Sequence, residues 1–543
     1  MSETALSIGW KSRPLMLLAG AIVIIMTISR VAPAAARDDI YLDDAQQHIY
    51  WMYRYADPTL FPDDLSIEYF GSPAVVTPGY GASYAVLAPY VDPQLLSELL
   101  AGVLMLVCGW LSMLIGARAA PRWPDLGALT AVVTLVALHL MIALTETAAL
   151  QRSFALPTLM LCVWALMARR MVWLGAAFVV AALFYLVVIP VLGVCSLIVG
   201  GVRVAQERRL PRRWWAAMLL GVVALGVVGM RDVPDDIGPL VTLDEARTMP
   251  EFQPGGRQQL FIDDPVHYYI TSARTGFRMS PLELALIALA VAVVTVSPGP
   301  RSLPLEGWAL LGSALLCWVL AHGLMFAMYL PNRHVTWAMP LAVIILIAAA
   351  VPQWLMRLRS RVDLHRQWLI CGGLLAVWLG LGGYWMTATW MSPRAHDREA
   401  AYAFLATLPR DTLIAAHPFD ANPVPLRTRR SVLASHETAI AFYLGYYRRL
   451  KPRIEASLAA TYATDWETVD ALAQQYGVDA FLVTPRGYNQ TAFFRPFQAS
   501  IDTATRGIAR EDFVLLHPPE DRILFRSGDV VVVRVGPATS SRR

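Results

Sequence analysis

Long apolar runs alternate with short polar loops over the first 391 residues. A helix that crosses the hydrocarbon core of a bilayer needs about 20 mainly apolar residues. The runs cover residues 15–29, 95–115, 126–144, 153–167, 171–202, 214–230, 282–296, 305–329, 335–356 and 368–391. We interpret the run 171–202 as two short passes that turn near 185–190, because a single pass would export the arginines that follow it. The pattern therefore predicts about eleven transmembrane helices.

Charged residues between these runs predict the sidedness. Cytoplasmic loops carry an excess of Lys and Arg, and Lys11 and Arg13 precede the first run. Two long acidic loops, 32–94 and 231–280, are then expected on the outer face. We expect the first run to remain as an anchor, with a cleaved signal peptide as the alternative. An odd number of crossings places the C-terminal region on the outer face as well.

From residue 392 onwards the composition is that of a soluble domain. Helical periodicity alternates there with short strand patterns, which is typical of a small α/β domain. The helices are expected near 398–408, 438–450 and 466–476, and the strands near 412–416, 480–484, 523–525 and 530–535. The fold class is thus a polytopic α-helical membrane domain, 1–391, followed by an extracytoplasmic α/β domain, 392–543.

Composition supports this interpretation and excludes several classes of function. Hydrophobic residues make up 56% of the chain and charged residues 16%, which excludes an ordinary soluble globule. All five cysteines lie in apolar runs, so neither a disulfide framework nor a zinc site is indicated. The net charge of +4 is small, and no nucleic-acid partner is expected. The motifs of P-loop nucleotide hydrolases, serine hydrolases and zinc proteases are absent.

The acidic pair Asp43 and Asp44 is the strongest catalytic candidate. It follows the first span within a stretch rich in acids and aromatic residues. A carboxylate at the edge of low-dielectric material has a raised pKa, and a second carboxylate raises it further, which suits a general base. If residues 41–55 form a helix, His48 lies one turn from Asp44 as a proton partner. In the alternative interpretation the acids only begin a solvated helix and His48 joins an aromatic cluster.

Arg333 is the first candidate for binding a substrate phosphate. It stands in an outer turn between two spans, where a guanidinium is costly unless paired, and its planar fork fits phosphate oxygens. The alternative is an arginine that extends to lipid headgroups. Further candidate substrate ligands are placed in the outer loops and turns: Arg54, Glu68, Tyr69, Arg152, His267 and His334.

The acids of the first outer loop are candidate ligands for a divalent cation. Asp63, Asp64 and Glu68 could share one in the first outer loop, because carboxylates are the ligands of hard cations. No calcium-loop spacing is present, and no other cofactor motif occurs.

The layout resembles a known superfamily. A first span, an outer loop with paired acids in Asp43-Asp44-Ala-Gln-Gln-His48, many further spans and an outer α/β domain resemble the GT-C integral-membrane glycosyltransferases. These include the protein O-mannosyltransferases, the aminoarabinose transferases of lipid A and the catalytic subunits of oligosaccharyltransferases. The Trp-Trp-Asp signature of the last group is absent, which argues against N-glycosylation.

The resemblance implies an inverting transfer of a sugar from a polyprenyl-phosphate donor. The acceptor would be a glycan, lipid or protein on the outer face, and membrane lipids would surround the chain. Asp44 or Asp43 would deprotonate the acceptor hydroxyl, and Arg333 would hold the donor phosphate.

Other classes remain open from the sequence. A transporter or flippase, or a polymerase of lipid-linked glycans, would also act on a lipid carrier, and a non-catalytic scaffold is a further alternative. Transporters usually carry charged residues within their spans or inverted repeats of broken helices, and this chain shows few of either. The compact loops favour a bacterial inner membrane, with the N-terminus cytoplasmic and the C-terminal domain periplasmic or extracellular.

Overall fold

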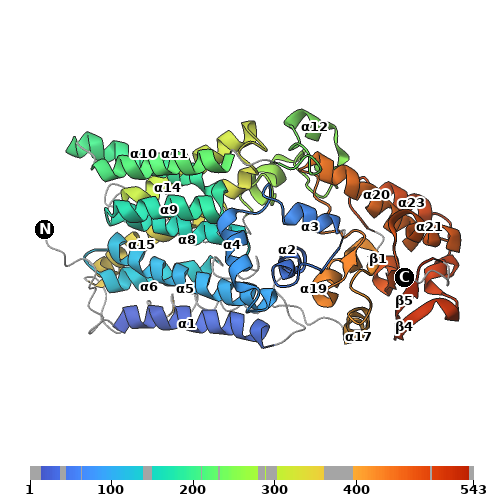
Figure 1. The fold of residues 1–543 in the computed structure, drawn as a ribbon. Coiled ribbons are helices and arrows are strands. Elements are labelled where there is room, and N and C mark those ends of the chain that lie inside the picture. The colour runs from blue at the N-terminus through green and yellow to red at the C-terminus, as the bar shows by residue number, and fades with distance from the viewer. Residues whose placement is uncertain are drawn as a thin grey trace.

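A bundle of helices fills one end of the molecule and an α/β domain fills the other, with the outer loops between them (Figure 1). The structure is a computed structural model of the chain. It describes residues 14–36, 45–62, 64–138, 149–208, 211–229, 233–278, 288, 303–359, 373, 396–489 and 492–536.

The described helices of the bundle lie where apolar runs predicted spans. They are α1 (Pro14–Ala35), α5 (Pro93–Ala119), α6 (Pro124–Ala137), α8 (Ala155–Met167), α9 (Met171–Phe184), α10 (Ile189–Glu207), α11 (Arg212–Gly229), α14 (Leu305–Gly323) and α15 (Ala338–Arg359). Within the described residues, 5 stretches are long and apolar enough to cross a membrane. The chain is therefore a membrane protein.

The predicted break in the run 171–202 is confirmed, because α9 ends at Phe184 and the short helix η3 (Leu186–Val188) separates it from α10. The predicted spans at 282–296 and 368–391 lie outside the described residues apart from residues 288 and 373. The count of eleven crossings therefore stays a prediction.

Short helices form the outer loops. The first loop contains α2 (Ala45–His48), η1 (Tyr50–Tyr55), α3 (Leu65–Phe70) and α4 (Pro78–Leu87), and the second contains α12 (Leu243–Thr248), η4 (Pro250–Phe252) and η5 (His267–Thr271). Two further short helices, η2 (Gln151–Phe154) and η7 (Pro331–His334), precede α8 and α15. Over the described residues 45–55, the single helix considered from the sequence is interrupted, because α2 ends at His48 and η1 begins at Tyr50.

The C-terminal domain is the α/β domain that the sequence predicted. Its strands β1 (Leu413–Ala416), β2 (Ser431–Val432), β3 (Ala480–Val483), β4 (Ile523–Ser527) and β5 (Val530–Arg534) form one sheet in the order β2-β1-β3-β5-β4. β1 is parallel to β2 and β3, whereas β5 is antiparallel to β3 and β4. The sequence analysis missed β2, which has 2 residues and is too short to show a period.

Helices cover this sheet and fill its connections. They are α17 (His396–Leu405), α18 (Pro418–Ala421), α19 (Val424–Thr428), α20 (Leu444–Thr461), α21 (Trp466–Tyr476), α22 (Pro485–Asn489) and α23 (Gln498–Thr505). All four residues of β3 are buried, which explains its continuous apolar sequence.

The prediction of a helix over 438–450 was wrong in its first half. The helix α20 begins at Leu444, and the residues before it form a loop. Backbone pairing with the second outer loop holds the end of this segment: Val241 N donates to Phe442 O at 2.8 Å, and Leu444 N donates to Pro239 O at 3.0 Å. The loop after β2 consequently reaches the outer loops of the membrane domain instead of winding into α20.

Polar contacts join the C-terminal domain to the first outer loop. Asp92 caps the start of α5 by accepting from the backbone of residues 94 and 95, and it also accepts from the Tyr53 hydroxyl at 2.7 Å. Arg429 of the C-terminal domain lies 3.3 Å from Asp92 Oδ2 and stacks on the Tyr53 ring. Glu68 pairs with Arg449 of α20 at 2.9 Å. These contacts fix the domain over one end of the bundle.

We predict that the close crossing of α5 and α6 does not tolerate a side chain. A Cβ at Gly116 would lie 2.3 Å from the carbonyl oxygen of Gly127, and a Cβ at Gly127 would lie 2.3 Å from that of Gly116. Gly116→Ala or Gly127→Ala should therefore force the helices apart and destabilise the fold by about 1–3 kcal/mol. The measurement is the thermal unfolding midpoint of the detergent-purified protein.

Gly20→Ala in α1 is the matched control, because a Cβ there meets nothing within 4 Å. Unchanged midpoints for both Gly116→Ala and Gly127→Ala would contradict the prediction.

Candidate functional site

Three arginines from separate segments of the chain meet at the end of the bundle that faces the C-terminal domain. Arg152 belongs to η2, Arg333 belongs to η7, and Arg274 follows η5 in the second outer loop. The backbone N–H of Asn332 donates to the carbonyl of Arg274 at 3.1 Å, which holds the last two segments together. We call Arg152, Arg274 and Arg333 the arginine cluster.

The members of the arginine cluster act on one another. Burial lowers the pKa of Arg152, and the nearby charge of Arg333 lowers it further, while Tyr185 and Tyr329 act in the opposite sense. Burial and Arg333 likewise lower the pKa of Arg274. Arginine keeps its proton under all ordinary conditions, so the effect of Arg333 on Arg152 and Arg274 describes a repulsion between cations.

A phosphate would relieve this repulsion. Within the described part of the chain, no carboxylate lies within ion-pair distance of Arg274 or Arg333, and Arg333 Nε is buried without a hydrogen-bond partner. Gathering like charges away from water is unfavourable unless an opposite charge arrives. Guanidinium groups bind phosphate oxygens in a two-pronged geometry. The arrangement is therefore suited to an anion, and to a phosphate in particular.

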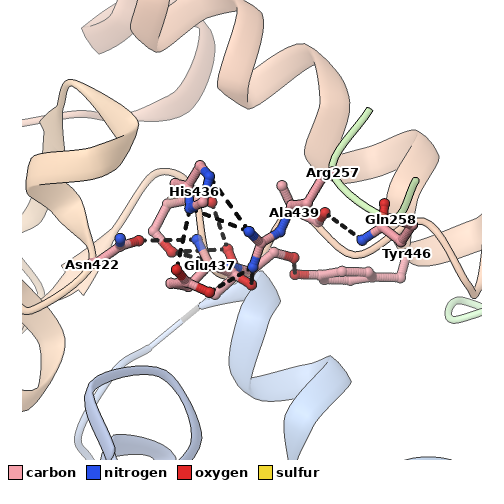
Figure 2. A network of polar contacts seen from close by, with 9 residues as sticks. Arg257, Gln258, Asn422, His436, Glu437, Ala439 and Tyr446 are labelled. Carbon is pink, nitrogen blue, oxygen red and sulfur yellow. Dashed lines mark hydrogen bonds and ion pairs between the residues drawn. The ribbon is translucent and has the colours of Figure 1, made fainter. Parts of the chain in front are cut away.

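A second polar centre lies where the two outer loops meet the C-terminal domain (Figure 2). Arg257 Nη2 donates to Glu437 Oε2 at 2.6 Å and to the Glu437 carbonyl at 2.8 Å. Arg257 Nη1 lies 3.3 Å from His436 Nδ1, which in turn is 3.3 Å from Glu437 Oε1. We call Arg257, His436 and Glu437 the junction network.

Neighbouring residues hold the junction network in place. The Asn422 side chain accepts from the backbone N–H of Glu437 at 3.0 Å, and Gln258 donates to the carbonyl of Ala439 at 3.2 Å. Tyr446 of α20 donates its hydroxyl to the carbonyl of Thr438 at 2.9 Å. Both sides of the network are thus fixed by hydrogen bonds (Figure 2).

His48, the last residue of α2, borders this network. Its ring packs edge-on against Phe70 with the ring centroids 4.8 Å apart. Burial lowers the pKa of His48 to about 4, with Glu437 raising it and Arg257 lowering it. The imidazole is consequently neutral at pH 7 and can accept a proton or a hydrogen bond.

The two centres are neighbours. Arg257 acts electrostatically on Arg274 and on His48. Tyr329 acts on Arg152 and on Tyr69, and Tyr69 stacks on Tyr446 with centroids 4.1 Å apart. The structure thus brings His48, Tyr69, Arg152 and Arg333, four of the residues predicted from the sequence, to one region.

Asp43 and Asp44 lie outside the described residues. The next residue, Ala45, begins α2 and is buried, and α2 contacts α19 of the C-terminal domain. The role of the acidic pair stays a prediction.

The other predicted ligands have local partners. Glu68 pairs with Arg449, His267 Nδ1 lies 2.7 Å from the Thr271 hydroxyl, and His334 Nε2 lies 2.9 Å from the Met328 carbonyl. Arg54 is exposed on η1. None of these contacts joins the four residues to the arginine cluster or the junction network, although His334 follows Arg333 directly in η7. Their predicted roles remain untested.

The acids considered for a cation are also separated. Asp63 lies outside the described residues, and Asp64 is the N-cap of α3, where it accepts from the backbone of Ser66 and Ile67. Across the described ranges, no group of three or more metal-ligating side chains occurs. Cation use therefore stays a prediction.

Sequence reasoning missed Arg257, Arg274, His436 and Glu437. Arg274 stands near the start of a predicted span, where an arginine is usually explained by membrane headgroups. His436 and Glu437 follow the two-residue strand β2 and fell at the edge of a predicted helix. Their convergence joins segments about 180 positions apart in the chain, and no local pattern reports such a contact.

Comparison with known proteins shows the fold. No family model and no curated protein matches the sequence. The structure is similar to the apo oligosaccharyltransferase of Archaeoglobus fulgidus, with TM-score 0.53 and 10% identity over 89% of this chain and 71% of that chain.

A structure of the oligosaccharyltransferase AglB from the same organism, in complex with an inhibitory peptide and a dolichol-phosphate, gives TM-score 0.52 and 8% identity, covering 88% of this chain and 69% of that one. Identities this low establish a shared fold and no more. At the level of the fold, this similarity agrees with the layout on which the GT-C resemblance was based.

Arg333→Gln should stabilise the empty protein, because it removes one of three mutually repelling charges. We expect the thermal unfolding midpoint to rise by about 1–3 °C. Addition of inorganic pyrophosphate should raise the midpoint of the wild type more than that of the variant.

Arg247→Gln is the matched control for this experiment, because Arg247 is an exposed arginine of the second outer loop and pairs with Asp244. An unliganded midpoint that falls in Arg333→Gln, with an unchanged response to pyrophosphate, would show that the cluster is not an anion site.

Proposed function

We propose that this protein is an inverting GT-C-type glycosyltransferase that moves a sugar from a polyprenyl-phosphate donor to an acceptor on the outer face of the membrane. The arginine cluster is the observation that carries the proposal. The shared fold with oligosaccharyltransferases supports the same class of reaction. The AglB structure contains a dolichol-phosphate, which is also a lipid-linked phosphate.

The position of the arginine cluster matches the two-part character of such a donor. A polyprenyl-phosphate sugar has a long apolar tail and an anionic head, so it requires apolar surface next to fixed positive charge. The helix α14 exposes Leu316, Val319 and Leu320, and η7, which carries Arg333, packs against it. The tail would lie in the bilayer against such surface while the phosphate meets the arginines.

The proposed reaction is a single displacement at the anomeric carbon. Asp44 or Asp43 takes the proton from the acceptor hydroxyl, and the acceptor oxygen forms a bond to the anomeric carbon from the face opposite the phosphate. The bond from that carbon to the phosphate oxygen breaks, and its electron pair leaves with the polyprenyl phosphate. Charge therefore accumulates on the leaving phosphate, where the arginine cluster stabilises it most in the transition state.

Neutral His48 is a suitable partner for the proposed base, because it follows the acidic pair by one helical turn in sequence and can accept a hydrogen bond. A divalent cation held by the acids of the first loop is a further part of the proposal and is not required by the charges described.

The acceptor is a glycan, a lipid or a protein. We place the protein in a bacterial inner membrane, with its C-terminal domain on the periplasmic side.

We predict that Asp44→Asn and Arg333→Ala each reduce sugar transfer at least about 100-fold, the range expected for loss of a general base or of leaving-group stabilisation. The measurement is mass analysis of lipid-linked sugars and finished glycans from cells that carry each variant. The unreacted donor should accumulate on the outer leaflet. A flippase defect would instead leave the donor on the inner leaflet.

Glu520→Gln is the control, since this carboxylate is 91% exposed in the C-terminal domain. Normal glycan output from well-folded Asp44→Asn and Arg333→Ala proteins would overturn the proposed function.

A further inference from the structure

The carboxyl ends of strands β1 and β3 form a polar edge that the proposed reaction does not use. β1 lies between β2 and β3 and is parallel to both, so the strand order reverses beside β1. In open α/β sheets, ligands bind at the carboxyl edge where the order reverses. His417 and Asp420 follow β1, and Thr484 and Arg486 follow β3. A ligand site is therefore expected at this edge.

Asp420 joins the two strand ends. Its carboxylate accepts from the Thr484 hydroxyl at 2.6 Å and lies 3.3 Å from Arg398 Nη1. The Asp420 side chain is 1% exposed, so water does not compete for these contacts. In the loop after β2, the Glu437 carboxylate is paired with Arg257 at 2.6 Å. Both carboxylates are thus already neutralised by arginines.

His417 presents a hydrogen-bond donor at this edge. Its Nδ1 accepts from the backbone N–H of Phe419 at 3.4 Å. Burial, together with the charge of Arg486 and the ring of His436, lowers the pKa of His417 to about 4, so the imidazole is neutral at pH 7. A neutral imidazole carries one proton. Because Nδ1 is an acceptor, that proton lies on Nε2.

The Nε2–H group of His417 has an unused hydrogen-bonding capacity. His417 is 3% exposed, and among the residues that the structure describes its Nε2 has no hydrogen-bond partner. The ring is held in place, since a Cβ at Gly487 would lie 3.0 Å from His417 Cγ and the Tyr462 hydroxyl fixes the Gly487 carbonyl at 2.8 Å. A buried donor of this kind is stabilised when an acceptor binds beside it.

Two phenylalanine rings border the His417 side chain. The ring centroids of Phe419 and Phe493 lie 5.6 Å and 5.8 Å from that of His417, and they are 4.9 Å from each other. Both phenylalanines are only partly buried. The segment of Phe493 is held by the second outer loop, because Arg495 N donates to Gly255 O at 2.9 Å. Apolar rings around a few fixed polar groups are typical of small-molecule sites.

Arg486 adds a positive charge to the same place. Its side chain is exposed, and its guanidinium carbon lies 5.6 Å from the centre of the Phe419 ring. Guanidinium groups bind carboxylate oxygens in a two-pronged geometry. We call His417, Phe419, Arg486 and Phe493 the strand-end site.

We propose that the strand-end site binds an acidic sugar of a glycan acceptor. The sugar carboxylate accepts from His417 Nε2 and pairs with Arg486, while the C–H face of the sugar ring lies against the phenylalanine rings. Donors from two side chains, beside carboxylates that already have arginine partners, favour an anion. The inference rests on the proposed function, because it selects a glycan from the three acceptor classes.

The strand-end site borders the junction network. The His436 ring lies 4.2 Å from the Phe419 ring and 5.7 Å from the Phe493 ring, measured between centroids. Figure 2 shows His436 beside Arg257 of the second outer loop. An acceptor held at the strand ends would therefore lie next to the region where the C-terminal domain meets the outer loops.

The first experiment measures binding of glucuronate to the purified full-length protein by ligand-observed NMR. Glucose has the sugar ring without the carboxylate, and acetate has the carboxylate without the ring. Each should bind at least about tenfold more weakly than glucuronate, because each lacks one of the two kinds of contact.

Variants test the two donors separately. Arg486→Gln should weaken glucuronate binding at least about tenfold. His417→Asn keeps an acceptor for the Phe419 backbone N–H but lacks the donor at the position of Nε2, so it should weaken binding to a similar degree. His417→Gln places an amide donor near that position and should recover part of the loss. Arg526→Gln is the matched control, because Arg526 is an exposed arginine of β4, at the far edge of the sheet.

Four results would overturn the inference. Glucuronate fails to bind the wild type; it binds Arg486→Gln or a folded His417→Asn as tightly as the wild type; or glucose, acetate or a short acidic peptide binds the wild type as tightly as glucuronate does. The fourth is binding that is lost in Arg333→Gln and retained in Arg486→Gln, which would place the anion in the arginine cluster.

Folding of each variant is checked by its thermal unfolding midpoint. Arg486 is exposed, so Arg486→Gln decides the question even if neither His417 variant folds. Failure of the proposed function would look different: glucuronate would bind the strand-end site, but the wild type would transfer no sugar.

Discussion

Repulsion among three arginines at the end of an apolar helix bundle is the constraint on which the rest of this site depends. Arg152, Arg274 and Arg333 come from three segments that only the folded chain brings together, and each segment adds positive charge where water is partly excluded. Like charges gathered away from water are stabilised when an opposite charge binds beside them. In the proposed reaction, the phosphate of the lipid-linked donor would bring that charge from the membrane side.

The C-terminal domain contributes a negative charge, that of Glu437, to the same region. Its loop after β2 meets the second outer loop at Arg257, and Arg257 in turn acts on both the arginine cluster and His48. A change in the position of this domain would therefore alter the electrostatic environment of the arginine cluster and of His48 together. The ion pairs of Arg429 with Asp92 and of Arg449 with Glu68 hold the domain in that position.

The parts of the fold governed by local periodicity could be predicted from the sequence. Apolar runs located the described bundle helices, and the alternation of helix and strand patterns identified the α/β domain. The prediction failed where tertiary contacts override local preference. Residues 438–443 have helical periodicity, but residues 442–444 pair with residues 239–241, and α20 begins only at Leu444.

The candidate site also contains residues that local sequence patterns identify and residues that only tertiary contacts reveal. Arg333, Arg152 and His48 could be chosen because polar side chains at membrane edges are conspicuous in an apolar sequence. Arg274 and Glu437 could not, because their importance lies in partners that are distant along the chain.

The most direct measurement of the central claim is a density map of the protein bound to a polyprenyl phosphate. The account predicts that the phosphate lies within hydrogen-bond distance of at least two of the guanidinium groups of Arg152, Arg274 and Arg333. A phosphate bound elsewhere, with these three side chains unliganded, would contradict it.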